Sequence, residues 1–143
     1  MPKIALFPGS FNPIHEGHYA IIDKALKLFD QVVVLVSFNP DKNNLDNLEE
    51  RFATVQAKLT HYGDKVVVLQ NKNQLTADVA RNLGIEFILR SARNDTDYSY
   101  ELELAAGNKA VNPNLETILI IPDYDSINYS STLIRHKKKL GLL

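Results

Sequence analysis

Cysteine is absent from the 143-residue chain, and this excludes disulfide bonds, thiolate metal sites and a cysteine nucleophile together. The chain also lacks an excess of charge of either sign. It has 16 lysine and arginine residues and 17 acidic residues, which gives a formal net charge of -1. The protein therefore has no global attraction for nucleic acids or acidic membranes, and any anion site must be local.

The N-terminus lacks a long hydrophobic run. The apolar segment Ile4–Phe7 is broken by Pro8 and Gly9, and it is too short for a secretory signal or a membrane span. We therefore expect a cytoplasmic protein with no membrane or nucleic-acid partner. Apolar residues make up 45% of the chain, and its length is close to the roughly 150 residues of one domain. The composition predicts a single domain over residues 1–143.

Short apolar runs alternate with amphipathic segments along the chain. Such alternation with short connections predicts an α/β protein with a doubly wound parallel sheet and helices on both faces. Ligands of such sheets bind at the carboxyl ends of the strands. The expected strands are Ile4–Phe7, Val32–Val36, Val66–Leu69, Phe87–Leu89 and Thr117–Ile121, and the expected helices are Gly17–Phe29, Leu48–Leu59, Leu75–Leu83 and Asp97–Ala110, with a polar loop over Asn39–Asn47 and a solvated helix end at Arg135–Lys139.

A polar segment, Gly9–His18, joins the first predicted strand to the first predicted helix. Unpaired backbone N–H groups and the positive end of the helix dipole favour a phosphate there, with Ser10 and His18 as additional donors. An isolated histidine at this point would more often only cap the helix. Two histidines framing a glycine, in His15-Glu16-Gly17-His18, favour a phosphate site instead.

This tetrapeptide resembles the H-x-G-H signature of the nucleotidyltransferases related to class I aminoacyl-tRNA synthetases. Near the C-terminus, Tyr129-Ser130-Ser131-Thr132-Leu133-Ile134-Arg135 resembles the I-S-S-T-x-I-R pattern that contacts ATP phosphates in the same superfamily. A serine-rich helix start alone is an ordinary cap. The two motifs together, in the expected order, make the resemblance specific and imply a Rossmann-like nucleotidyltransferase fold.

A longer resemblance, from Lys3 to about Arg135, is to the phosphopantetheine adenylyltransferase family. Arg90–Asn108 is similar to the family segment R-G-x-R-x-x-x-D-x-x-Y-E-x-x-x-A-x-x-N, Gly9–Pro13 to G-T/S-F-D-P, and Leu48–Arg51 to L-x-E-R. The chain departs from the family pattern at three positions: Asn12 replaces aspartate, Ser91 replaces glycine, and His15 stands where the family often has another residue.

The resemblance implies a role for each matching residue. His18, Lys42 and Arg90 would be catalytic, and phosphopantetheine would contact Ser10, Lys42, Leu75, Thr76 and Arg90. ATP would contact Ser10, Phe11, His18, Ser91, Ala92, Arg93, Glu101, Ser126, Ile127, Asn128, Tyr129, Ser130, Ser131 and Thr132.

The resemblance also implies the reaction, in which the adenylyl group of ATP passes to 4′-phosphopantetheine and gives dephospho-coenzyme A and pyrophosphate. Mg²⁺ would be held mainly by ATP phosphates, because no carboxylate cluster suggests a protein metal site. A homo-oligomer, a hexamer by family resemblance, is expected.

Several alternatives remain open at the level of sequence. The acceptor could be nicotinate mononucleotide, flavin mononucleotide or glycerol phosphate, and a non-catalytic nucleotide-binding module is a further alternative. The absence of tryptophan and of aromatic residues near Gln74–Val79 favours a pantetheine arm over a stacked ring. Tyr98, Tyr100 and Tyr124 could stack a ring, and the similarity of Arg90–Asn108 to the family segment decides for the pantetheine arm. Arg90 or Arg93 could pair with Asp97 or Glu101 only. Lys42 could be a solvated charge, and Leu75 and Thr76 could be core and N-cap residues.

Overall fold

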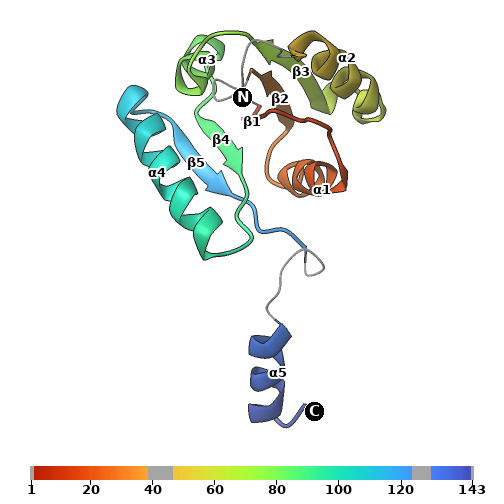
Figure 1. The fold of residues 1–143 in the computed structure, drawn as a ribbon, viewed down its shortest axis with the longest axis vertical. Coiled ribbons are helices and arrows are strands. Elements are labelled where there is room, and N and C mark those ends of the chain that lie inside the picture. The colour runs from red at the N-terminus through yellow and green to blue at the C-terminus, as the bar shows by residue number, and fades with distance from the viewer. Residues whose placement is uncertain (1, 39–46, 124–129, 143) are drawn as a thin grey trace.

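The computed structural model describes residues 2–38, 47–123 and 130–142, in which five strands alternate with helices (Figure 1). In chain order the elements are β1 (Ile4–Gly9), α1 (Glu16–Ala25), β2 (Gln31–Ser37), α2 (Leu48–Lys58), the 3-10 helix η1 (Thr60–Lys65), β3 (Val66–Asn71), α3 (Thr76–Leu83), β4 (Phe87–Arg90), α4 (Asp95–Val111), β5 (Glu116–Leu119) and α5 (Ser130–Lys139).

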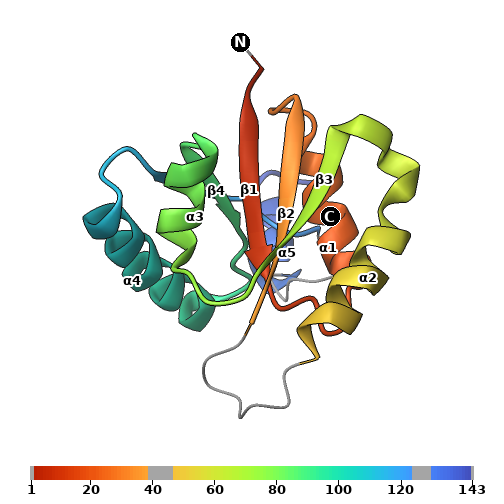
Figure 2. The same cartoon turned by 90° about the horizontal axis from the view of Figure 1, so that it is seen from above.

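The strands form one parallel sheet in the order β3-β2-β1-β4-β5. Figure 2 shows α1 and α2 on one face of this sheet and α3 and α4 on the other. The predicted doubly wound α/β fold is therefore confirmed. The chain moves outward from β1 to β3 and then returns to the opposite side of β1 at β4. The carboxyl ends of β1 and β4 thus flank the point where the winding reverses, where doubly wound sheets bind ligands.

Alternation of side chains along the central strands builds a core on each face of the sheet. In β1, Ala5 and Phe7 pack on the side of α1, while Leu6 packs on the side of α3. In β2 all of Val32–Val36 is buried, because this strand is covered on both faces. An unbroken β-branched and aliphatic run is typical of such a strand.

Several boundaries differ from the sequence predictions. Helix α1 ends at Ala25, before the predicted Phe29, and turns occupy the residues between them. Helix α4 begins at Asp95, two residues before the predicted start at Asp97. The Asn94 side chain accepts from the N–H of Asp97 and caps the helix. Leu75 is the N-cap of α3, its side chain is exposed, and so the alternative that it is a core residue is wrong.

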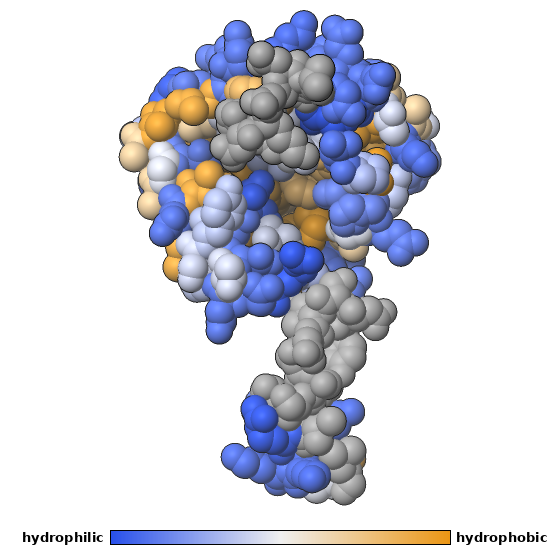
Figure 3. Space-filling view, in the orientation of Figure 1, coloured by the Kyte–Doolittle hydropathy of each residue, from blue (hydrophilic) through white to orange (hydrophobic). Residues whose placement is uncertain are grey.

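The basic run at the end of α5 is exposed, as predicted for a solvated helix end. Figure 3 shows this end of α5 as a hydrophilic surface. In the residues that the structure describes, no helix is both long enough and apolar enough to cross a membrane.

Candidate active site

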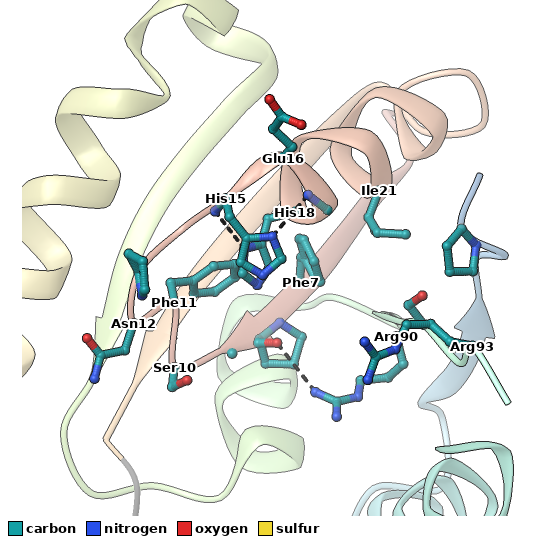
Figure 4. A pocket seen from close by; sticks show the side chains of 16 residues that line it. Phe7, Ser10, Phe11, Asn12, His15, Glu16, His18, Ile21, Arg90 and Arg93 are labelled. Carbon is teal, nitrogen blue, oxygen red and sulfur yellow. Dashed lines mark hydrogen bonds between the residues drawn. The ribbon is translucent and has the colours of Figure 1, made fainter. Parts of the chain in front are cut away.

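A cavity of about 860 Å³ lies at the carboxyl edge of the sheet, where β1 and β4 end (Figure 4). Its walls come from the segment that joins β1 to α1, from the end of β4 and from the chain that follows β5. The lining residues are Phe7, Pro8, Gly9, Ser10, Phe11, Asn12, Pro13, His15, Glu16, Gly17, His18, Ile21, Arg90, Ser91, Arg93 and Pro122.

Six of the residues predicted to bind substrate line this one cavity, although they come from two distant parts of the sequence. Ser10 and Phe11 follow β1 and His18 lies in the first turn of α1, whereas Arg90 ends β4 and Ser91 and Arg93 follow it. Parallel strands end at a common edge, which explains why these segments meet.

The turn that starts α1 holds its two histidines through their Nδ1 atoms. Nδ1 of His15 accepts from the N–H of Gly17 at 3.0 Å, and Nδ1 of His18 accepts from the N–H of His15 at 3.1 Å. The two residues thus form a reciprocal capping box at the helix start. A neutral histidine whose Nδ1 accepts carries its proton on Nε2, so each ring presents an Nε2–H donor.

This capping box corrects one sequence prediction. The N–H groups of Gly17 and His18 are not unpaired, because the first donates to Nδ1 of His15 and the second to its carbonyl oxygen at 2.9 Å. The helix N-terminus keeps its positive dipole end, but these two backbone donors are used inside the turn. Capping and ligand binding are nevertheless compatible here, because the caps use the Nδ1 atoms of the two histidines and leave their Nε2 atoms to bind a ligand.

The His18 ring is packed among aromatic rings. Its centroid lies 4.0 Å from that of His15, 4.8 Å from that of Phe11 and 6.2 Å from that of Phe7. Burial, and secondarily the neighbouring charge of His15, lowers the pKa of His18 to about 4. His18 is therefore neutral at pH 7, and it can donate one hydrogen bond without adding a positive charge.

The two glycines of this segment make room for aromatic rings. A Cβ at Gly17 would lie 2.8 Å from Cε1 of His15, and a Cβ at Gly9 would lie 3.0 Å from the Phe11 ring. Phe11 itself adopts a positive φ of 49° while its side chain is buried. Both glycines thus serve the close packing that places the His15, Phe11 and His18 rings.

Arg90 is paired with Glu101 of α4 by two hydrogen bonds. Nε donates to Oε1 at 2.8 Å and Nη2 to Oε2 at 3.0 Å, while Nη1 lies 3.5 Å from the carbonyl oxygen of Pro8. The Glu101 side chain is only 6% exposed and does not line the cavity. Glu101 therefore orients the guanidinium, whose Nη1 side faces the end of β1.

Arg93 is paired with Asp97 one helical turn further on. Its N–H and its Nε both donate to Oδ2 of Asp97 at 3.1 Å, and the two donors hold the pKa of that carboxyl below its usual value. The Arg93 side chain remains 63% exposed at the cavity rim. Both pairings proposed as alternatives for these arginines are present, yet Arg90 and Arg93 still line the cavity.

The remaining predicted residues lie elsewhere. Ala92 is buried in the core, and Leu75 and Thr76 begin α3 away from the cavity wall. Gln74 and Val79 of the predicted acceptor segment line a separate cavity of about 400 Å³. Ser130, Ser131 and Thr132 form the first turn of α5. The predictions for Lys42, Ser126, Ile127, Asn128 and Tyr129 lie outside the described residues.

Sequence reasoning gave no role to Arg51, which is buried in α2 and donates to the carbonyl oxygen of Ser10, a cavity residue. Two signals were available: Arg51 matches the last position of the family segment L-x-E-R, and its helical spacing from Leu48 and Val55 places a charged residue on the buried face of the helix. Within the described residues, no group of three or more histidine and acidic side chains is arranged to hold a metal ion.

Comparisons with known proteins match most of this chain to one family. The model of the cytidylyltransferase-like family matches residues 6–137. A phosphopantetheine adenylyltransferase of Mycoplasma capricolum subsp. capricolum is 39% identical over 133 residues, which is 93% of this chain and 94% of that protein. One of Syntrophus aciditrophicus is 37% identical over 141 residues, which cover 99% of this chain and 84% of that protein.

Solved structures show the same fold at lower identity. The lipopolysaccharide core biosynthesis protein of Thermoplasma volcanium has a TM-score of 0.58 with this chain at 17% identity, over 86% of this chain and 98% of its own. A bifunctional NMN adenylyltransferase/ADP ribose pyrophosphatase of Francisella tularensis has a TM-score of 0.57 at 19% identity, over 95% of this chain and 43% of its own. The fold is thus shared beyond the range of close sequence similarity.

Proposed function

We propose a division of roles within the cavity, from the premise that the chain belongs to the phosphopantetheine adenylyltransferases of the cytidylyltransferase-like family. The reaction is transfer of the adenylyl group of ATP to 4′-phosphopantetheine, which yields dephospho-coenzyme A and pyrophosphate for coenzyme A synthesis. A phosphate oxygen of the acceptor attacks the α-phosphorus of ATP, and the bond from that phosphorus to pyrophosphate breaks. The nucleophile is already anionic, so neither a general base nor a covalent intermediate is required.

His18 is the proposed donor to the transferring phosphoryl group. The observation that carries the proposal is its Nδ1 acceptor bond from His15, which puts the proton on Nε2 at the cavity. A neutral donor in a partly desolvated site can stabilise oxygen charge that grows in the transition state. The positive end of the α1 dipole acts in the same direction.

The two arginines of the cavity are proposed to bind different substrates. Arg93 and Ser91, at the cavity rim, are proposed to bind ATP phosphates with Ser10 and Phe11. Arg90, held by Glu101 against the end of β1, is proposed to bind the phosphate of the acceptor together with Lys42. Two anchored cations would offset the repulsion between two polyanions brought into line.

Mg²⁺ is proposed to arrive with ATP as part of the substrate. Among the described residues that line the cavity, Glu16 is the one carboxylate, and a metal that prefers six oxygens would take most of them from the triphosphate and water. Bound in this way, the ion would neutralise phosphate charge during transfer.

Assembly and location belong to the same proposal. Helix α4 exposes Tyr98 and Leu102, which lie one turn apart on the same side of the helix, and apolar side chains exposed in this way support association into the hexamer expected from the family resemblance. Sedimentation equilibrium would test the hexamer. A cytoplasmic location is proposed because the reaction consumes ATP, and fractionation of cells would test it.

The acceptor is tested by measuring pyrophosphate release from ATP and Mg²⁺ with a panel of phosphorylated acceptors. Phosphopantetheine should be the fastest. Tyr98 and Tyr100, two of the residues that could stack the ring of a mononucleotide, are not among the described residues that line the cavity. Faster release with nicotinate mononucleotide or flavin mononucleotide would overturn the acceptor assignment, and no release with any acceptor would favour a nucleotide-binding module.

A further inference from the structure

We propose that Arg51 of α2 is a positioning residue that sets the ends of β1 and β2 relative to each other, and with them the ATP and acceptor sides of the site. The inference rests on the proposed function, because it assumes that the chain beyond β1 and the chain beyond β2 both carry substrate-binding residues. Arg51 is not among the described residues that line the cavity, so the proposal assigns its effect to the backbone that it holds.

The Arg51 side chain bridges three segments from a buried position. The residue is 5% exposed. One nitrogen, Nη1, donates to the carbonyl oxygen of Ser10 at 2.6 Å and to that of Ser37 at 2.9 Å. Nε donates to Oδ1 of Asn47, the N-cap residue of α2, at 2.9 Å. A single guanidinium thus joins the turn after β1, the end of β2 and the start of α2.

On the ATP side, the bond to Ser10 fixes the orientation of one peptide group. The carbonyl of Ser10 and the N–H of Phe11 belong to the same planar unit and point in opposite directions. Since the carbonyl points to Arg51, which lies outside the cavity, the N–H of Phe11 points away from Arg51. Ser10 and Phe11 both line the cavity, and both are proposed to bind ATP phosphates.

On the acceptor side, Ser37 is the last residue of β2, and the chain that follows leads to Lys42. The neighbouring strands are in register up to the pair Gly9 and Val36, so both carbonyls held by Arg51 lie one residue beyond that pair. Arg51 therefore holds the backbone of both segments directly after the last residue pair between β1 and β2.

A purely structural role would not require a charge at this position. Arg51 lies on the buried face of α2 with Leu48 and Val55, where an apolar side chain would avoid the cost of desolvating a guanidinium. What the guanidinium adds is a rigid set of donors in fixed directions. Those directions match two backbone carbonyls that come from segments 41 and 14 residues away in sequence.

The test compares Arg51→Met and Arg51→Lys with Val55→Ala as a matched control. Val55 is fully buried in the same helix, and its truncation weakens the packing of α2 without touching either carbonyl bond. At a temperature where circular dichroism shows all proteins folded, Arg51→Met should lower kcat on the order of 100-fold, because small displacements of reacting groups have effects of this size. It should also weaken ATP binding in calorimetry several-fold.

Arg51→Lys should lower kcat less, by roughly threefold to tenfold, because an ammonium can reach a carbonyl but lacks the planar fork. Val55→Ala should lower the melting temperature and leave kcat and both KM values within twofold of wild type. Wild-type kcat in folded Arg51→Met, or an equal loss in Val55→Ala, would overturn the proposal. If Arg51→Met fails to fold, a kcat within twofold of wild type in Arg51→Lys would overturn it.

Wild-type activity separates this inference from the proposed function. If the wild type releases no pyrophosphate with phosphopantetheine, the proposed function fails, and the calorimetric comparison of ATP affinity still decides the role of Arg51. Unchanged ATP affinity in Arg51→Met, or in Arg51→Lys if the first variant does not fold, would then overturn it.

Discussion

The backbone N–H of His15 donates to Nδ1 of His18 at 3.1 Å, and this one bond selects which nitrogen of His18 carries the proton at the cavity. His15 is the helix cap, and its ring also packs against that of His18, with the ring centroids 4.0 Å apart and the ring planes tilted by 46°. The turn therefore orients its histidine donor by the same bonds that start the helix. Preorganisation of this kind avoids reorientation during the reaction.

His18→Ala is expected to lower kcat by roughly 100-fold or more while ATP affinity stays largely intact, because a donor aimed at developing charge acts mainly in the transition state. Steady-state kinetics and calorimetry on the same preparation measure the two effects. Near-normal turnover in this variant would remove His18 from the mechanism.

Stability should depend on pH through His18. Its folded pKa of about 4 lies below the value of about 6.5 in an unfolded chain, so the unfolded state binds more protons between these values. The free energy of unfolding should thus fall as the pH drops from about 6.5 to about 4, and this contribution should change no further below that. Urea unfolding of wild type and His18→Gln at several pH values isolates the contribution of His18 to this pH dependence. Parallel pH profiles for the two proteins would contradict the prediction.

Arg90→Ala and Arg93→Ala form a matched pair with opposite expected effects on binding. Arg90→Ala should weaken acceptor binding more than ATP binding, as should Lys42→Ala, whereas Arg93→Ala should weaken ATP binding more. Calorimetric titration with each substrate measures both. A loss of ATP affinity with unchanged acceptor affinity in Arg90→Ala would mean that the two subsites are exchanged.

The same two arginine variants should differ in stability. Arg90→Ala leaves the buried carboxylate of Glu101 without its partner, which should cost about 2 kcal/mol or more in the free energy of unfolding. Arg93→Ala removes an exposed pair, which should cost less than the loss of the buried pair. Denaturant unfolding at pH 7 tests the order of the two effects.

Gly17→Ala should destabilise the protein by about 1 kcal/mol through the loss of the His15 cap, and it should lower kcat as His18 shifts. The added Cβ would meet the His15 ring at 2.8 Å. Gly107→Ala is the control, because nothing lies within 4 Å of that position in α4 and alanine favours a helix interior. The control should therefore be more stable than wild type. Thermal melts that rank the two variants in the reverse order would argue against the capping role.

The sequence by itself determined the parallel α/β fold and the edge of the sheet where Ser10, His18, Arg90 and Arg93 meet. Strand and helix periods are local properties, and parallel strands end at a common edge, so motifs that follow strands fall together without further information. The sequence offered helix capping as an alternative role for His15. It did not show that the cap occupies the backbone N–H groups of Gly17 and His18.

Only the tertiary structure decided which partners these residues have. Arg90 pairs with Glu101, and Arg51 reaches Ser10 and Ser37, through contacts between separate elements. Such pairings depend on the packing of helices against the sheet to within a fraction of the length of a hydrogen bond. A sequence pattern carries the period of a helix and the side it buries, but it does not carry the position of a carbonyl oxygen 41 residues away.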